Sequence, residues 1–106
     1  MRLAYPIILI PFDDKSGGYT VEIPDLPGCV TEGRDLADAL LMAEDAASGW
    51  VLTELEEGRP APKASKPSEI RTESPDQPVS MVALDMDSYA AKYGSRSIRK
   101  NVTIPA

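Results

Sequence analysis

Apolar and polar residues follow a period of two in two segments near the start of the chain. Residues 3–12 are rich in β-branched and aromatic side chains, and residues 18–24 alternate between apolar and polar side chains. This pattern is typical of half-buried β-strands. The intervening residues 13–18 combine aspartates with two glycines, which favours a tight turn and predicts a β-hairpin. Pro6 lacks an amide hydrogen, so we expect an edge position or a bulge at that point of the first strand.

A period of three and four residues follows a short third strand. Residues 24–28 form a breaker cluster, and residues 29–32 predict the third strand. Asp35 is a good N-cap and Gly58 a good C-terminal stop, so the pattern predicts a helix of about 22 residues between them. Its apolar positions are Leu36, Leu40, Ala43, Ala47, Val51 and Leu55.

The second half of the chain begins with a proline-rich segment. Residues 59–78 contain five prolines and few large apolar side chains. Such a composition buries too little surface to offset the entropy of ordering, so we expect an exposed arm. Residues 79–85 are apolar on both faces and predict a fourth strand that pairs with the first. Asp85 or Asp87 then caps a short helix over residues 88–93.

The order strand, strand, strand, helix, strand, helix predicts one α+β domain. We expect an antiparallel sheet with the long helix packed on one face. A chain of 106 residues has room for one hydrophobic core of ordinary size. We therefore expect residues 1–94 to form the domain and residues 95–106 to form a separate segment.

Four residues of the predicted helices have specific structural interpretations. Gly49 lies inside the long helix, where it lowers helix stability, and this favours a neighbour that packs closely against it. Trp50 is expected in the core or at its margin. Tyr89 and Tyr93 are four residues apart and are expected to hold the short helix against the sheet.

Charge is distributed unevenly along the chain. All 17 acidic residues lie at or before Asp87, and residues 1–93 have a net charge of −9. Residues 94–106 contain Arg96, Arg99 and Lys100 and no acid. An acidic body suits a basic protein partner, and a basic end suits phosphate, although a solvated acidic surface with an incidental basic end explains the charges equally well.

The chain lacks the usual residues for several kinds of chemistry. It has no histidine, so Cys29 has no imidazole to activate it as a nucleophile, and no zinc site is expected. We interpret Cys29 as a small buried apolar residue and predict no catalytic residue, metal or cofactor. The longest apolar run, residues 4–12, is far shorter than a membrane span, and no secretory signal precedes it. A cytoplasmic protein is expected.

One run of residues resembles a known family. GYTVEIPDLPGCVTEG at residues 18–33, the capped helix DLADALLMAEDAASGWVLTELEEG at residues 35–58 and the P-x-P that follows resemble HicB antitoxins. The resemblance implies a partial ribonuclease-H-like fold, no catalysis, and assembly into dimers or higher oligomers. It also implies binding to a small HicA toxin, an mRNA-cleaving ribonuclease, as part of a type II toxin–antitoxin pair.

RKNVTIP near the end resembles the first strand of the ribbon-helix-helix module that many HicB antitoxins carry. In that module two chains pair their strands into a ribbon that enters the major groove of operator DNA. The resemblance implies that Arg99, Asn101 and Thr103 face the bases. The two helices of the module do not follow in this sequence, so we expect operator repression only in a form that has them. We expect residues 95–106 to be disordered or to be held by another chain.

An acidic surface can mimic the phosphates of RNA and so occupy the basic face of a ribonuclease. Five acids close to the turn, the third strand and the end of the long helix are candidate toxin contacts: Asp25, Glu32, Glu54, Glu56 and Glu57.

Two other functions are compatible with the sequence. An active ribonuclease-H-like enzyme holds divalent metal with several acids, and Asp13, Asp14, Glu22 and Asp85 are available. Their predicted positions do not converge, which argues against a nuclease. A HicB-like domain that acts as an oligomeric scaffold without a toxin is the second alternative, and the neighbouring gene distinguishes it from an antitoxin.

Overall fold

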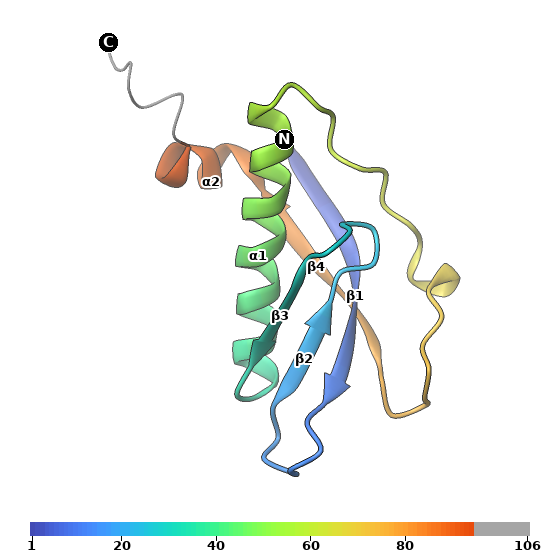
Figure 1. Ribbon diagram of the computed structural model, residues 1–106. Helices are drawn as coiled ribbons and strands as arrows, with labels where there is room; N and C mark the ends of the chain where they lie inside the picture. Colours follow the sequence, from blue (N-terminus) through green and yellow to red (C-terminus); the bar gives the residue numbers. More distant parts are fainter. Residues whose placement is uncertain (95–106) are drawn as a thin grey trace.

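The computed structural model describes residues 1–94, and in them four strands and two α-helices form an α+β fold (Figure 1). This confirms the predicted fold class and element order. The expectations for residues 95–106, including those for Arg99, Asn101 and Thr103, lie outside the described residues. The elements are β1 (Arg2–Pro11), β2 (Tyr19–Glu22), β3 (Val30–Gly33), α1 (Leu36–Glu56), the 3₁₀ turn η1 (Pro67–Glu69), β4 (Val79–Asp85) and α2 (Met86–Tyr93).

The four strands form one antiparallel sheet in the order β3-β2-β1-β4. The predicted hairpin is present, with Pro11 opposite Tyr19 and with Gly17 at a φ of +93° in the turn. The predicted pairing of the fourth strand with the first is also present and runs from Arg2 opposite Asp85 to Ile8 opposite Val79. The sequence pattern was sufficient here because each strand end carries its own turn residues.

Pro6 lies in a part of β1 that has only one neighbouring strand. The register with β4 passes through it without a bulge, but the pairing with β2 begins only at Ile8, so the expected edge position at this point is confirmed. The amide of Leu9 points to β4, where it donates to Pro78 O over 2.9 Å. Backbone groups alternate in direction along an antiparallel strand, so the nitrogen of Pro6 points to the β2 side. The ladder with β2 begins only at Ile8, and the missing donor therefore breaks no hydrogen bond.

Both ends of α1 have the predicted caps. The carboxylate of Asp35 accepts from the amide of Asp38 over 2.8 Å, and the carboxylate of Asp38 accepts from the amide of Arg34 over 2.9 Å. At the other end Gly58 has a φ of +82°, which places the amide of Arg59 at 2.8 Å from Glu54 O. These bonds satisfy backbone groups that a helix end otherwise leaves unpaired.

The core lies between α1 and one face of the sheet. Buried side chains on β1, β2 and β4 face a row of small residues on the helix, Ala39, Ala43 and Ala47. The backbone contact at the start of the helix is close, because a Cβ built on Gly33 would lie 2.2 Å from Ala39 N. The predicted apolar row was shifted at its first position, since Leu36 is 47% exposed and Ala39 is buried in its place.

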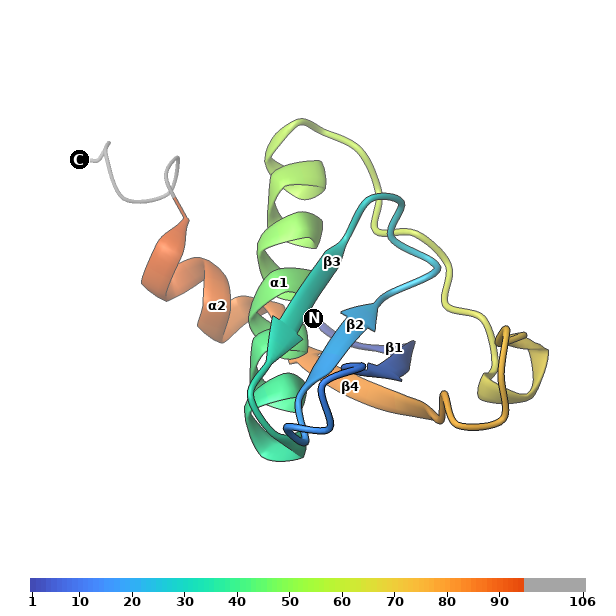
Figure 2. The same cartoon turned by 60° about the horizontal axis from the view of Figure 1, so that its bottom comes forward.

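The arm, residues 59–78, crosses the end of the sheet and returns to β4 on the side away from α1 (Figure 1 and Figure 2). None of its residues is buried, in agreement with the expected exposure. It is nevertheless fixed to the domain, because Tyr5 Oη donates to Pro62 O over 2.6 Å and Asp25 binds Ser65. Exposure therefore does not mean that the arm is free.

The short helix α2 packs beside α1, not against the sheet as its tyrosines had suggested. Tyr89 lies over Gly49, where an added Cβ would be 3.1 Å from the Tyr89 hydroxyl oxygen. The rings of Tyr89 and Tyr93 are 4.7 Å apart between centroids, and Tyr93 is 54% exposed. The expected close neighbour of Gly49 is confirmed, and the expected clamp on the sheet was wrong because the tyrosines line the space between the helices.

Candidate functional site

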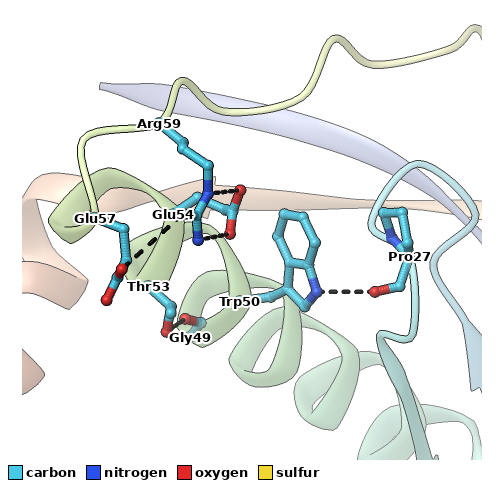
Figure 3. Close-up of polar contacts among 7 residues, drawn as sticks. All are labelled: Pro27, Gly49, Trp50, Thr53, Glu54, Glu57 and Arg59. Carbon is cyan, nitrogen blue, oxygen red and sulfur yellow. Dashed lines mark hydrogen bonds and ion pairs between the residues drawn. The ribbon is translucent and has the colours of Figure 1, made fainter.

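The last turn of α1 ends in a charged network (Figure 3). The guanidinium of Arg59 donates to both carboxylate oxygens of Glu54, over 2.9 and 2.8 Å, and lies 4.0 Å from the carboxylate of Glu57. The hydrogen bond from Arg59 holds the pKa of Glu54 below its ordinary value. Because the helix cap places Arg59 beside Glu54, this carboxylate already has a cationic partner within the chain.

Trp50 joins α1 to the turn that connects β2 and β3. Its indole Nε1 donates to Pro27 O over 3.0 Å (Figure 3), and its ring packs against the margin of the core. This confirms the predicted position at the core or its margin. The contact holds the β2–β3 turn close to the last turns of the helix.

Asp25, in the same turn, is bound to the arm. Its carboxylate accepts from the amide of Ser65 over 2.8 Å and from the Ser65 hydroxyl over 2.7 Å. Burial and, secondly, the negative charge of Asp25 raise the pKa of Tyr5, which donates to the arm nearby. Both oxygens of Asp25 are therefore engaged in holding the arm.

The remaining candidate contacts are spread over the domain. Glu32 is exposed on β3, next to Gly33 and so close to the first turn of α1. Glu54 lies 15 residues beyond Ala39, about 22 Å farther along the helix axis. Glu56 and Glu57 have interaction partners within the chain. The structure brings Glu54, Glu56 and Glu57 together at one end of α1 and leaves Glu32 apart from them.

A groove between α1 and α2 was not recognised from the sequence. It has a volume of about 280 Å³ and is lined on the α1 side by Leu41, Glu44, Asp45 and Ser48. The α2 side supplies Asp85, Ser88, Tyr89, Lys92 and Tyr93. Acids in the middle of a long helix look like a solvated surface, and only the packing of α2 shows that these line a concave site.

Cys29 is buried, and burial raises the pKa of its thiol. The interpretation as a small apolar residue is confirmed by its place in the core cluster.

The four acids considered for a nuclease do not gather at one site. Asp14 accepts from the amide of Ser16 in the β1–β2 turn, and Asp85 caps α2 by accepting from the amide of Ser88. Within residues 1–94 no three acidic or cysteine side chains gather as a metal site would require. In the same residues no helix has the length and apolar character needed to cross a membrane.

Comparison with protein families gives a match over nearly the whole chain. The model of the HicB_like antitoxin of bacterial toxin-antitoxin systems matches residues 5–106. The chain belongs to this HicB-like antitoxin family. A 14.9 kDa protein from the rep-hol intergenic region of Haemophilus phage HP1 is 33% identical over 107 residues. That alignment covers 98% of this chain and 74% of the phage protein.

Several solved structures share the fold. A toxin–antitoxin complex from Streptococcus pneumoniae matches with a TM-score of 0.76 and 24% identity, over 99% of this chain and 82% of that one. The N-terminal domain of the Burkholderia pseudomallei antitoxin HicB matches with a TM-score of 0.65 and 26% identity. The match covers 78% of the present chain and 99% of that domain. The HicA3 and HicB3 toxin-antitoxin complex matches with a TM-score of 0.62 and 25% identity. This match covers 78% of the present chain and 99% of the chain in the complex.

Proposed function

We propose that this HicB-like antitoxin binds and neutralises a HicA toxin, a small mRNA-cleaving ribonuclease, and that it acts by binding and not by catalysis. The observation that carries the proposal is the family match over residues 5–106. Relatives of similar fold occur in solved toxin-antitoxin complexes. Because its target cleaves mRNA, the antitoxin acts in the cytoplasm.

The acidic surface supports inhibition by occupation of the RNA site. A ribonuclease attracts RNA through basic side chains, and residues 1–93 of this chain have a net charge of −9. Carboxylates on a rigid domain can take the places of phosphates without offering a bond to cleave. Hydrogen bonds to Asp25 and Glu54 also hold the arm and the helix end. All five acids, Asp25, Glu32, Glu54, Glu56 and Glu57, stay proposed contacts.

Operator binding is a separate proposal. Arg99, Asn101 and Thr103 remain the candidate base contacts in a form of the protein that completes the ribbon-helix-helix module. Such a module requires two chains, so operator binding also implies a homodimer or a higher oligomer.

The proposed function predicts a gene for a small ribonuclease beside the gene of this protein, and co-expression of the two products tests it. We expect the ribonuclease alone to stop growth, the pair to grow, and the two proteins to purify together. Continued growth arrest with no co-purification would overturn the proposal and would favour an oligomeric scaffold.

A further inference from the structure

The groove between α1 and α2 combines charge with aromatic surface. Glu44 and Asp45 are exposed, and neither has an ion pair or a hydrogen bond from a side chain within residues 1–94. Tyr89 and Tyr93 form the facing wall. Lys92, on the rim, lies 5.7 Å from the centre of the Tyr93 ring and is the one cation that lines the groove among residues 1–94. The groove is therefore acidic on the α1 side and aromatic on the α2 side.

Ser48 adds a polar group at the bottom of this groove. Its side chain is 3% exposed and lines the groove between the two helices. Its hydroxyl has no hydrogen-bond partner among residues 1–94, whereas Thr53 in the same helix donates to Gly49 O over 3.0 Å. A buried polar group without a protein partner is unusual, and this hydroxyl is available to a ligand that enters the groove.

Leu41 adds an apolar side chain to the α1 side of the groove. It is 65% exposed, although it is a large aliphatic side chain in the middle of a stable helix. An exposed apolar side chain beside carboxylates and tyrosines is typical of a protein interface, where aromatic groups, aliphatic groups and a few polar groups occur together.

Resting on the proposed function, we propose that the α1–α2 groove receives an arginine-bearing segment of the toxin. A guanidinium fits each wall, because it forms paired hydrogen bonds with carboxylates and stacks on aromatic rings. Glu44 and Asp45 supply the carboxylates, Tyr89 and Tyr93 the rings, and Ser48 the acceptor oxygen at the base. The aliphatic stem of the arginine lies along Leu41.

The charge of the groove selects this occupant over a second copy of the domain. Residues 1–93 are strongly acidic, so two copies repel each other at this surface, whereas a ribonuclease that binds RNA carries the opposite charge. The chain's own basic residues Arg96, Arg99 and Lys100 are the competing occupant, and the experiment below separates the two.

Charge reversal in the groove tests the proposal. The full chain carrying Glu44→Lys and Asp45→Lys is compared with the unchanged chain for binding to the purified toxin. The control carries Glu22→Lys and Glu73→Lys, which change the net charge equally but lie by the sheet face away from α1. We expect the dissociation constant to rise on the order of 100-fold in the groove variant and less than about 5-fold in the control.

The two proposals fail in different ways. No binding by the unchanged chain overturns the proposed function itself. Equal binding by the groove variant and the control, when circular dichroism shows both folded, overturns the groove as the toxin site. That result is also the one expected if the chain's own basic end fills the groove.

Ser48→Ala gives a second, independent test. Removal of a hydroxyl that has no partner in the free chain should leave the thermal midpoint unchanged or raise it, while toxin binding weakens about 2- to 10-fold. A purely structural serine would change both quantities in the same direction or neither of them, and such a result would contradict the proposal.

Discussion

Two acidic regions of this antitoxin use their carboxylates in different ways. At the end of α1 Glu54 is paired with Arg59, and in the adjacent β2–β3 turn Asp25 is bound by Ser65. In the α1–α2 groove Glu44 and Asp45 are exposed and have no such partners within residues 1–94. The first region uses its charge to hold the fold together, and the second keeps its charge available for another molecule. We infer from this difference that acids without partners in the domain are better candidates for binding than their position in an acidic sequence alone would indicate.

The largest effect on stability is expected from Trp50→Ala. The change removes a ring that packs at the core margin and the hydrogen bond to Pro27 O. Since Trp50 is only half-buried, we expect a loss of about 2–3 kcal/mol in the free energy of unfolding, below the range for fully buried aromatic residues. Urea denaturation measures it. If the variant is folded but no longer binds the toxin, the toxin site lies at this end of α1 and not in the α1–α2 groove.

Asp25→Ala is expected to have a smaller effect. It removes two hydrogen bonds to Ser65 and should lower the free energy of unfolding by about 1–2 kcal/mol. Ser65→Ala removes the hydroxyl partner, so the double variant should cost less than the sum of the two single changes. Additive losses would show that the two side chains act independently and that Asp25 does not secure the arm.

The smallest effect concerns pH and Glu54. Its pKa is lowered in the folded chain, chiefly by the hydrogen bond from Arg59. A carboxyl of this kind stabilises the fold above its unfolded pKa, about 4.3, and the contribution is lost as the pH falls through the lower folded value. NMR titration of the Glu54 carboxyl should give a higher midpoint in Arg59→Gln than in the unchanged chain. Identical midpoints would mean that the pair does not form in solution.

The fold was predictable where local signals agree. Asp35 and Gly58 mark the ends of α1, and the glycine turn before Tyr19 fixes the hairpin. Pro6 also gave a correct signal, because it lies where β1 pairs with β4 alone, although the sequence did not show that β1 becomes an inner strand from Ile8 onward.

The site was less predictable because its contacts join distant residues. Asp25 and Ser65 are 40 residues apart, and no local pattern connects them. Tyr89 and Tyr93 were recognised as packing residues, but the sequence did not show that they face α1. Glu44 and Asp45 resembled a solvated helix surface until the position of α2 was known. The partner of Glu54 lies five residues away and could have been inferred from the glycine cap that brings Arg59 back to the helix.

Hydrogen–deuterium exchange of the full chain, alone and with the toxin, tests the central claim most directly. The claim that the α1–α2 groove binds the toxin predicts slower exchange in α2, residues 86–93, and little change in the β2–β3 turn, residues 24–28. Protection confined to that turn and to the last turn of α1, with exchange in α2 unchanged, would contradict it.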